Sequence, residues 1–486
     1  MKIKHILTAI AIALVSATSC DNLLDVKNPS YIYGEGYWST KNEVESYLTG
    51  TYTTFRTCCN TLEHFEARGD EFEPGLEGGG SNQWAHNLTS LNGISWGSYY
   101  IVIQNCNMII GNIAKADFSL ESDKNQILAE SYTLRAYMFF CLTRLWGDIP
   151  LETEATKGSA KPLPSRSSCT EAITQVIKDL ETAIELFPTD SWAKGKSRAS
   201  KPAAYALMAD ALLWKAKVLN GGDSDLREVI RYADLASAGT GLESDFSEIY
   251  GGRNGQEVIW SIHFGYPEIG DNYTHYLTLR DVFVEKAVNK DEIPYAKSGA
   301  RSSYIPSQQI RDILGKYKGD VRKDNAYVIA VDKDGNQLGI SQRKMPGTKT
   351  ETNVIFDNDI ILYRAAEMIL FKAEAYAALG DTESAVKELE KVRERAGIGK
   401  YTGSTDKTTV EKEILDERGR EFWLENKRWP DLLRFHYEGV IDVYQYVPKL
   451  KARHDAGITV PLYFAIPLSE LSLNHNLVQT TGYEEL

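Results

Sequence analysis

The stretch from Ile361 to Gly397 reads ILYRAAEMILFKAEAYAALGDTESAVKELEKVRERAG. Apolar residues recur at helical spacing on both sides of Gly380-Asp381, which predicts one helix from Ile361 to Leu379 and a second from Thr382 to Ala396. The glycine suits the end of the first helix. Small alanines on both sides of the turn let the two helices approach closely, so the stretch predicts an antiparallel helical pair.

This pair resembles a tetratricopeptide unit, and two further pairs follow the same pattern. One runs from Lys201 to Leu219 and from Asp225 to Ala238; the other combines Lys124–Trp146 with Thr170–Phe187. Each pair exposes an apolar face unless it stacks on a neighbour, so several pairs indicate one continuous superstructure. The predicted fold is mainly α, a tetratricopeptide-like helical-pair scaffold with long loop insertions and a few short β-hairpins.

Three long polar segments interrupt the helices, at 66–92, 147–168 and 239–359. Within the third, Glu257–Ile262 alternates like a strand, and Tyr327–Ile340 reads as a hairpin that turns at Asp334-Gly335. The acidic residues of this turn resemble the start of a calcium loop, but the closing glutamate is absent, which favours turn chemistry. Insertions on one face of a repeat scaffold are where ligands usually bind.

The N-terminus has the pattern of an export signal. Lys2 and Lys4 precede an apolar run from Ile6 to Val15, and small residues lead to Cys20. This resembles the lipobox of bacterial lipoproteins, in which the cysteine becomes the lipidated N-terminus. Ala17 stands where that motif usually has leucine, so an ordinary secretory signal cleaved near Ser19 stays open as an alternative. No later stretch approaches the length of apolar sequence that spans a bilayer.

Five segments are expected along the chain. They are 1–19, a lipoprotein signal peptide; 20–40, a lipidated tether and extended segment; 41–238, an N-terminal helical half; 239–359, a loop-rich insertion with short strands; and 360–486, a C-terminal helical half. We expect residues 20–486 to form one compact unit.

The net charge of the chain limits its partners, and its cysteines limit the disulfides and metal sites that it can form. The 486 residues carry a net charge of −13, which argues against nucleic acid because phosphates require a basic face. Beyond Cys20 there are five cysteines without metal-ligand spacing, which predicts neither a disulfide framework nor a metal site. Cys106 and Cys141 sit in apolar helical segments and are expected to be buried. A bridge involving Cys58-Cys59 stays open.

A series of motifs, in order along the chain, resembles the SusD/RagB family of nutrient-uptake lipoproteins from the Bacteroidota. The motifs are Leu24-Asp25-Val26-Lys27-Asn28-Pro29, Arg135-Ala136-Tyr137-Met138-Phe139-Phe140, Leu145-Trp146-Gly147-Asp148-Ile149-Pro150-Leu151, Arg198-Ala199-Ser200-Lys201-Pro202-Ala203-Ala204, Val392-Arg393-Glu394-Arg395-Ala396-Gly397, Glu417-Arg418-Gly419-Arg420-Glu421-Phe422 and Arg428-Trp429-Pro430-Asp431. The C-terminal motif departs from the family pattern at His475, Thr480 and Thr481.

The resemblance implies a SusD-like fold and a nutrient-binding lipoprotein of the outer membrane, lipid-anchored and surface-exposed. Such a protein would sit as a hinged lid on a SusC-like TonB-dependent transporter and deliver a captured oligosaccharide to it. The alternative is a surface adaptor on tetratricopeptide-like repeats that binds a peptide or protein without glycan specificity.

A further motif is Tyr363-Arg364-Ala365-Ala366-Glu367. Nine charged residues of this and the later motifs are best explained as ion pairs that fix how the helical pairs stack. They are Arg364, Glu367, Arg393, Arg395, Glu417, Arg418, Glu421, Arg428 and Asp431.

Candidate ligand residues are aromatic and polar side chains in loops, because sugars stack on aromatic faces and hydrogen-bond at their rims. The Gly-rich stretch 78–87 offers Trp84, with Asn82 and His86 beside it. The third insertion offers Tyr266, Tyr273, Tyr276, Tyr295 and Tyr304. Trp96, in contrast, opens an apolar helix and is expected in the core.

Catalysis is not expected. Asp70, Glu71 and Glu73 resemble a pair of acids for glycoside hydrolysis, but a solvated acidic loop or loop-fixing hydrogen bonds explain them better. No nucleophile elbow, zinc-protease or nucleotide-binding motif is present, and His263 lies in a predicted strand. The sequence predicts a binding protein without cofactor or metal.

Overall fold

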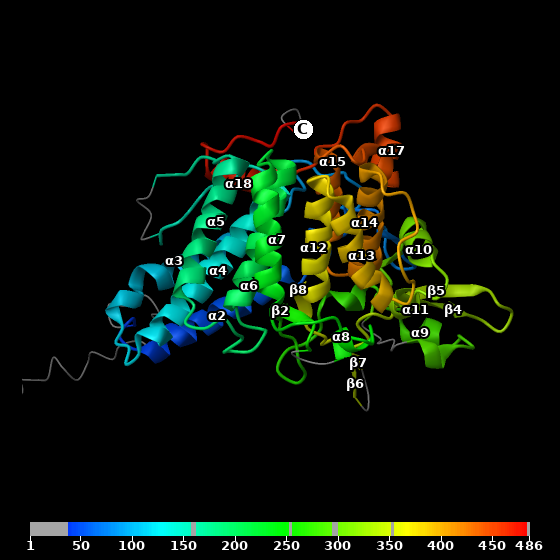
Figure 1. Ribbon diagram of the computed structural model, residues 1–486, viewed down its shortest axis with the longest axis horizontal. Coiled ribbons are helices and arrows are strands. Elements are labelled where there is room, and N and C mark those ends of the chain that lie inside the picture. Colours follow the sequence, from blue (N-terminus) through cyan, green and yellow to red (C-terminus); the bar gives the residue numbers. More distant parts are fainter. Residues whose placement is uncertain (1–36, 157–161, 252–254, 294–299, 351–353, 484–486) are drawn as a thin grey trace, which may run out of the picture.

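The computed structural model describes residues 37–156, 162–251, 255–293, 300–350 and 354–483, and they form a mainly helical protein with small sheets (Figure 1). The long helices are α2 (Lys41–Cys59), α3 (Gly97–Asn112), α4 (Glu121–Trp146), α5 (Cys169–Leu186), α6 (Lys201–Val218), α7 (Asp223–Ser237), α12 (Ala365–Ala378), α13 (Thr382–Arg395), α14 (Lys407–Phe422) and α15 (Arg428–Tyr437). Shorter ones are α8 (Glu248–Gly251), α9 (Asp281–Val284), α10 (Gln308–Gly315), α11 (Val321–Ala326), α16 (Val443–Tyr446), α17 (Pro448–Asp455), α18 (Leu468–Leu473) and the 3₁₀ turns η1 (Ile113–Lys115), η2 (Tyr273–Tyr276) and η3 (Lys290–Glu292).

Eight strands form four antiparallel two-stranded sheets within the described residues. They pair as β1 (Phe72–Pro74) with β3 (Tyr304–Pro306), β2 (Val258–Ile262) with β8 (Ile360–Arg364), β4 (Tyr327–Val331) with β5 (Gln337–Gln342), and β6 (Thr348–Lys349) with β7 (Val354–Ile355). The strand expected over Glu257–Ile262 is therefore confirmed as β2, and the expected hairpin is confirmed as β4–β5. Its turn is held by Asp332 Oδ1, which accepts the N–H groups of Asp334 and Asn336 at 2.8 Å each.

The helical pairs pack as the sequence indicates. α4 lies against α5, α6 against α7 and α12 against α13, while α7 packs on α12 and joins the first helices of the chain to the last ones (Figure 1). In Figure 1, β2, α8, β6 and β7 of the insertion lie at the lower centre, below α7 and α12, and β4, β5, α9, α10 and α11 lie at the right, beside α13 and α14. The predicted fold class, mainly α with a helical-pair scaffold and a few hairpins, is confirmed.

Local signals explain where the helices begin and end. Thr40 and Glu43 form a capping box at the start of α2, and Ser168 and Glu171 do so at α5. α4 ends at Gly147, whose φ of +76° is a conformation that favours glycine.

One predicted boundary is wrong. The first helix of the pair begins at Ala365 and not at Ile361, because Ile360–Arg364 forms strand β8 against β2. All five residues of this strand are buried. A run of Ile, Leu and Tyr fits a two-sided buried strand as well as a helix, so its apolar pattern alone does not separate the two.

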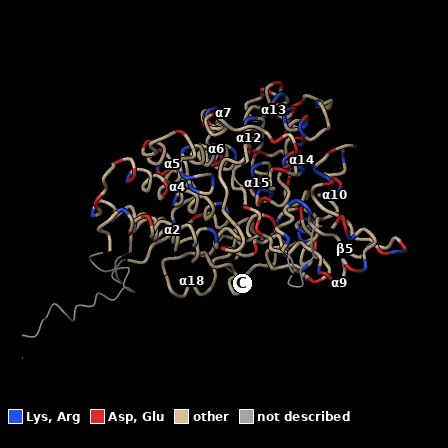
Figure 2. The backbone as a smooth tube through the Cα atoms, turned by 90° about the horizontal axis from the view of Figure 1, so that it is seen from below, with Lys and Arg blue, Asp and Glu red and all other residues tan. Residues whose placement is uncertain are grey.

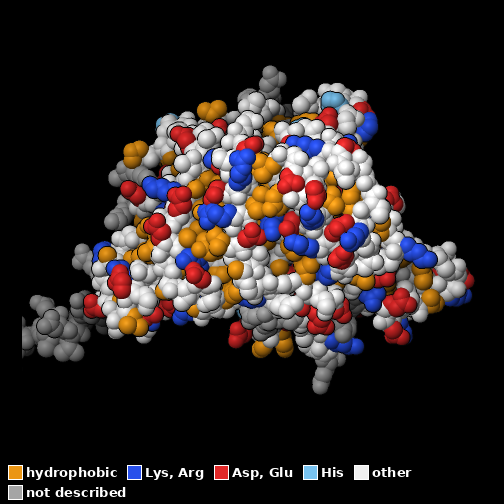
Figure 3. Space-filling view, in the orientation of Figure 1, with side chains coloured by type: hydrophobic (Ala, Val, Ile, Leu, Met, Phe, Trp, Pro, Cys, Tyr) orange, Lys and Arg blue, Asp and Glu red, His pale blue; other side chains and the backbone are white. Residues whose placement is uncertain are grey.

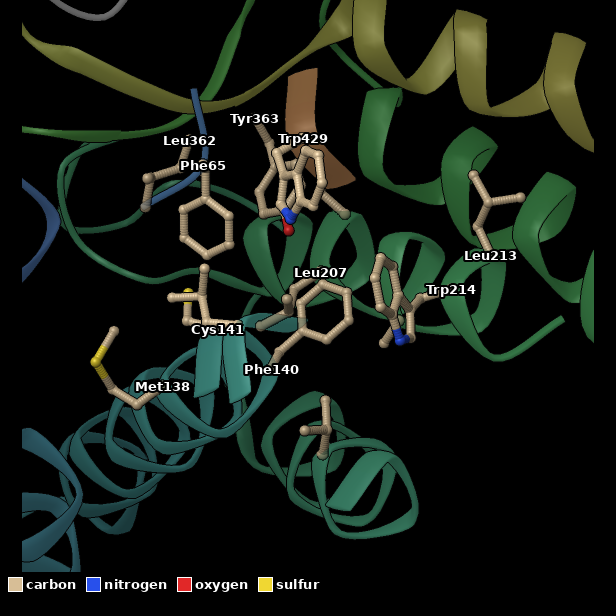
Figure 4. Packing of buried hydrophobic residues seen from close by; sticks show 14 of the residues in the cluster. Phe65, Met138, Phe140, Cys141, Leu207, Leu213, Trp214, Leu362, Tyr363 and Trp429 are labelled. Carbon is tan, nitrogen blue, oxygen red and sulfur yellow. The ribbon is translucent and has the colours of Figure 1, made fainter. Parts of the chain in front are cut away.

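One large hydrophobic cluster unites the helices. In Figure 4, Phe140 and Cys141 of α4 and Leu207 and Trp214 of α6 lie beneath Phe65, Leu362, Tyr363 and Trp429, which come from distant parts of the chain. Trp96 is also buried, at the start of α3. None of the described helices has the length and apolarity needed to cross a membrane.

The cysteines from Cys58 onward are free thiols, so the vicinal pair forms no bridge. Cys106 and Cys141 are buried as expected. Burial raises the pKa of the Cys106 thiol to about 12 and that of Cys141 to about 11, which keeps both protonated.

Buried ion pairs connect the elements around α14. The guanidinium of Arg364 contacts Glu421 at 2.6 Å and Glu425 at 2.9 Å, and it also pairs with Glu257 at the edge of β2. Arg395 of α13 reaches the same Glu421 and Glu257. Every charged motif residue named above lies in at least one ion pair, with partners that include Asp70, Glu257, Arg322, Glu413 and Glu425. The ion-pair interpretation of the motifs therefore agrees with the geometry.

We expect Arg364→Met to lower the free energy of unfolding by about 3–5 kcal/mol, because it leaves buried carboxylates without their cation. Denaturant unfolding of the chain that lacks residues 1–20 measures this. Lys387→Met is the control: Lys387 makes an exposed i,i+4 pair with Glu383, and its substitution should leave the free energy of unfolding nearly unchanged. Equal effects of the two substitutions would contradict a stabilising role of the buried network.

Candidate functional site

A hollow of about 460 Å³ opens between the end of α2 and three loops of the insertions. Its volume falls in the range of small-molecule sites. The lining residues come from four segments that are far apart in sequence: Asn60, Thr61, Leu62, Glu63; Gly78, Gly79, Gly80, Ser81; Tyr273, Tyr276; Ser303, Tyr304. We refer to this site as the hollow.

Backbone pairing brings these segments together. The β1–β3 ladder continues past Pro74, where the N–H of Gly75 donates to Ser303 O at 2.9 Å and the N–H of Glu77 donates to Ser302 O at 3.0 Å. The N–H of Ser303 in turn donates to Tyr276 O at 2.8 Å. The Gly-rich loop, the turn η2 and strand β3 therefore form one hydrogen-bonded wall.

Glu63 holds two lining residues in place. It accepts the hydroxyl of Tyr304 at 2.8 Å and the hydroxyl of Ser81, whose N–H donates to Tyr304 Oη at 3.1 Å. Burial and the nearby Glu63 raise the pKa of Tyr304, which stays protonated. The ring of Tyr304 is therefore a fixed part of the wall.

The other two tyrosines differ in exposure. Tyr273 is buried and donates its hydroxyl to Leu424 O at 3.1 Å, and burial raises its pKa. Tyr276 is 41% exposed and packs on His275 with ring centroids 3.9 Å apart. Tyr276 is therefore the tyrosine of this wall that presents an accessible ring.

Polar atoms complete the lining. The Nδ2 of Asn60 donates to Asp271 O at 3.4 Å, whereas its Oδ1 has no hydrogen-bond partner among the described residues. A buried acceptor without a partner is costly, and a ligand hydroxyl would satisfy it. An accessible aromatic ring beside amide, hydroxyl and carboxylate oxygens can hold a neutral molecule rich in hydroxyl groups.

Trp84 lies behind this wall. Its Nε1 donates to Phe72 O at 2.8 Å, and the ammonium of Lys449 stands 4.8 Å from the ring centre. A Cβ on Gly80 would come within 2.4 Å of the indole, so the ring packs directly against the Gly-rich loop. Burial lowers the pKa of Lys449 to about 7. Trp84 thus supports the loop; its predicted contact with a ligand stays a prediction.

The neighbours of Trp84 lie in different surroundings. Asn82 is exposed, and its carbonyl accepts the N–H of Asn87 at 2.9 Å. His86 is 4% exposed, with its Nε2 2.8 Å from Arg68 O. Burial, followed by the charge of Arg68, lowers the pKa of His86 well below its ordinary value, so the imidazole is neutral. His86 anchors the loop to the scaffold.

The hollow brings together Tyr273, Tyr276 and Tyr304 of the predicted residues. Tyr266 is 55% exposed but does not line the hollow; its N–H donates to Asp357 at 3.0 Å. Tyr295 and Cys20 lie outside the described residues.

Sequence reasoning missed Asn60 and Glu63. Asn60 directly follows α2, which ends at Cys59, and Glu63 comes three residues later. Polar side chains just after a long helix are a usable signal, but the sequence pattern predicts that the first insertion starts only at Glu66.

The acidic residues of the first insertion are structural. Asp70 is buried and forms a two-pronged ion pair with Arg428 at 2.7 and 2.8 Å. Glu71 is also buried, and burial raises its pKa. Glu73 contacts Arg311 at 3.4 Å. These contacts fix the loop, so the alternative of a solvated acidic loop is wrong for Asp70 and Glu71.

The structure also bears on two other possible sites, a reactive histidine and a metal site. The sequence places His263 in a strand, but β2 ends at Ile262 and His263 directly follows it. Its Nδ1 lies 3.1 Å from Asp359, as suits a structural histidine. No cluster of His, Cys, Asp and Glu with the arrangement of a metal site occurs in the described part of the chain.

Two family models match the chain. The model described as "SusD family" matches residues 273–483, and the model described as "Starch-binding associating with outer membrane" matches residues 24–213. SusD-like protein P38 of Formosa agariphila is 25% identical over 87% of this chain and 90% of its own length. The starch-binding protein SusD of Bacteroides thetaiotaomicron is 34% identical over a shorter region, 26% of this chain and 22% of that protein.

Solved structures share the fold. NanU of Bacteroides fragilis superposes with a TM-score of 0.80 at 24% identity, covering 94% of this chain and 99% of that one. A SusD superfamily protein from Bacteroides vulgatus gives a TM-score of 0.78 at 25% identity, covering 92% and 100%. With the motifs in order along the sequence and SusD-like relatives along most of its length, the chain belongs to the SusD/RagB family, whose members are non-catalytic binding proteins associated with the outer membrane.

Proposed function

We propose that this protein captures a short oligosaccharide in the hollow and delivers it to a SusC-like TonB-dependent transporter. The observation that carries the proposal is the combination of the accessible ring of Tyr276 with the unpartnered Oδ1 of Asn60 in one cavity of about 460 Å³. Sugars present apolar C–H faces and hydroxyl rims, and this lining offers a partner for each.

The charge of the lining supports a neutral ligand. Glu63 is the only lining residue that carries a formal charge, and both of its described side-chain contacts are with hydroxyl groups of the wall. An acidic glycan or an anionic peptide would find no cation among the described lining residues, and the carboxylate of Glu63 already accepts two hydroxyl groups of the wall. One relative, the starch-binding protein SusD of Bacteroides thetaiotaomicron, is named for a neutral glycan, which agrees with this ligand class.

The sequence and the family support a location of the protein at the outer membrane. We propose that Cys20 is lipidated and tethers the protein to the outer membrane, exposed at the cell surface. A tether keeps the binding protein at the membrane where its transporter lies. Family membership supports the outer-membrane location.

We expect Tyr276→Ala to weaken binding of the recognised glycan about tenfold, which corresponds to about 1.4 kcal/mol, because the accessible stacking face is lost. Titration of the chain without residues 1–20 against glycan and peptide panels, followed by Trp fluorescence, measures the affinity.

Tyr266→Ala is the matched variant, since Tyr266 is comparably exposed in the same insertion but outside the hollow. It should bind like the unmodified protein. If Tyr266→Ala loses affinity and Tyr276→Ala does not, the hollow is not the glycan site. Saturable binding to peptides alone would favour the adaptor alternative.

Gly80→Ala tests the loop that Trp84 supports. Gly80 has a φ of +76°, and a methyl group there would collide with the indole, so the loop must move. We expect glycan affinity to fall about tenfold. Gly79→Ala is the control because a Cβ at Gly79 meets no atom within 4 Å. Isothermal titration calorimetry compares the two, and an unaffected Gly80→Ala variant would show that the loop does not contact the ligand.

Cys20→Ser tests the tether. We expect the substitution to abolish metabolic labelling of the full chain with a palmitate analogue and to release the protein from the membrane fraction. Gel fluorescence after labelling in cells provides the measurement, with Cys169→Ser as the control thiol. Undiminished labelling of the Cys20→Ser variant would refute lipidation at this cysteine.

A further inference from the structure

Two glutamates of the first insertion are fully buried. In Figure 2, acidic and basic positions are interspersed among the helices, and the helical face in Figure 3 likewise mixes Asp and Glu side chains with Lys and Arg. Glu66 and Glu71, in contrast, are 0% and 1% exposed. Among the described residues, no donor group reaches the Oε2 atom of either side chain. We call these two residues the acid pair.

The carboxyl groups of the acid pair hydrogen-bond to each other. Since an ionised carboxylate only accepts hydrogen bonds, a bond between two carboxyl groups requires a proton on one of them. Two buried carboxylates side by side are not both ionised, because burial removes the water that would screen their repulsion. Burial, followed by the charge of Glu66, raises the pKa of Glu71 well above its ordinary range. The acid pair therefore holds one proton.

The charged groups around the acid pair are already matched. The ionisable groups there are Asp70 and Lys427 on the adjoining backbone, Arg428 of α15, Lys344 after β5, Glu425 after α14 and Tyr273 of η2. Each of the three cations holds another carboxylate: Arg428 pairs with Asp70 at 2.7 Å, Lys344 with Glu425 at 2.6 Å and Lys427 with Glu367 at 2.8 Å. A second negative charge on the acid pair would therefore have no cation of its own among the described residues.

Glu66 supports the backbone on which one wall of the hollow rests. Its carboxylate accepts the N–H of Lys427 at 3.1 Å and the N–H of Asn426. Leu424 and Asn426 have φ values of +68° and +61°, a conformation that costs energy outside glycine and needs such support. The hydroxyl of Tyr273, which lines the hollow, donates to Leu424 O at 3.1 Å. Glu66 and Tyr273 therefore hold the same turn.

Glu71 is tied to a second wall of the hollow. It directly precedes β1, and its carbonyl accepts the N–H of Ser307 at 2.8 Å, one residue after β3 ends. Strand β3 begins with Tyr304, which lines the hollow. The hydrogen bond within the acid pair thus joins the support of Tyr273 to the support of Tyr304.

We propose that the proton shared by Glu66 and Glu71 keeps the hollow in its binding arrangement, and that its loss to solvent as the pH rises separates the two walls and lowers glycan affinity. This inference rests on the proposed function and adds a regulation of the same site. The sign follows from linkage: the folded arrangement favours the protonated pair, so its stabilising contribution is complete at low pH and is lost as the pH rises through the raised pKa of Glu71.

Infrared difference spectroscopy tests the shared proton. A protonated carboxyl group has a carbonyl band that an ionised carboxylate lacks. At about pH 8, far above the ordinary pKa of glutamate, we expect the unmodified protein to show this band more strongly than Glu71→Gln. Glu73→Gln is the control, since Glu73 lies two residues away and pairs with Arg311, and it should leave the band unchanged. A band of full strength in Glu71→Gln would overturn the proposal.

Hydrogen exchange tests the opening of the wall without a ligand. The amides of Glu77 and Ser303 donate across the wall of the hollow. In the unmodified protein we expect their protection, corrected for the intrinsic rate at each pH, to fall at least about tenfold between about pH 6 and about pH 9. In Glu71→Gln it should fall less than about twofold, because the glutamine amide donates to Glu66 at every pH. Equal falls in the two proteins would overturn the proposal.

A second acid pair supplies the control for a general loss of stability. Glu411, near the start of α14, hydrogen-bonds to Glu438, and burial, followed by the charge of Glu438, raises its pKa to about 7. The turn that Glu66 holds follows the opposite end of α14. Glu411→Gln should therefore keep the pH dependence of the Glu77 and Ser303 amides. Loss of that dependence in Glu411→Gln would show that overall stability, and not the proton near the hollow, controls the wall.

Glycan titration over the same pH range connects the proton to capture. We expect the affinity of the unmodified protein and of Glu411→Gln to fall at least about tenfold from about pH 6 to about pH 9, and that of Glu71→Gln to change less than about twofold. Equal pH dependence in Glu71→Gln would refute the control of capture by the acid pair. Absence of glycan binding at every pH, with the exchange result as expected, would instead refute the proposed capture and leave the proton-controlled wall standing.

Discussion

The ion pairs around Arg364 are the constraint on which the arrangement of the fold depends. Arg364 ends strand β8 and directly precedes α12, while its carboxylate partners come from the insertion, at Glu257, and from the end of α14, at Glu421 and Glu425. The nearby cations hold the pKa of Glu421 well below its ordinary value. Removing one partner would leave an uncompensated buried charge, so the network favours the register in which the sheet, the helical pair and the insertion meet at Arg364. That register places the insertion that carries Tyr273, Tyr276 and Tyr304.

The hollow is a consequence of this rigid frame. Its lining residues stand on loops, but each loop is tied to the scaffold by hydrogen bonds: the Gly-rich loop through Ser303 and Ser81, and strand β3 through the bond of Tyr304 to Glu63. A binding site on loops that are fixed in this way loses little conformational entropy when a ligand arrives.

The sequence predicted the helices well and the site only in part, for physical reasons. Helical periodicity predicts α12 and α13. The apolar run from Ile361 to Tyr363 fits strand and helix patterns equally well, and it is a strand because it pairs with β2. Loop position selected Tyr276, whose ring is 41% exposed and lines the hollow, while its contact with a ligand stays a prediction. It could not foresee that Trp84 and His86 turn inward, because their partners, Phe72 O and Arg68 O, are backbone carbonyls that only tertiary structure brings near.

Trp84 supports the Gly-rich loop from behind, although a tryptophan in such a loop first suggests a side chain that contacts a ligand. A flexible loop of this composition would have to be ordered anew at each binding event. Trp84 instead packs under Gly80, with Lys449 at its face, and His86 fixes the chain six residues after Gly80. These contacts hold the loop against the scaffold, so Gly78, Gly79 and Gly80 are presented to the hollow in one arrangement before a ligand arrives.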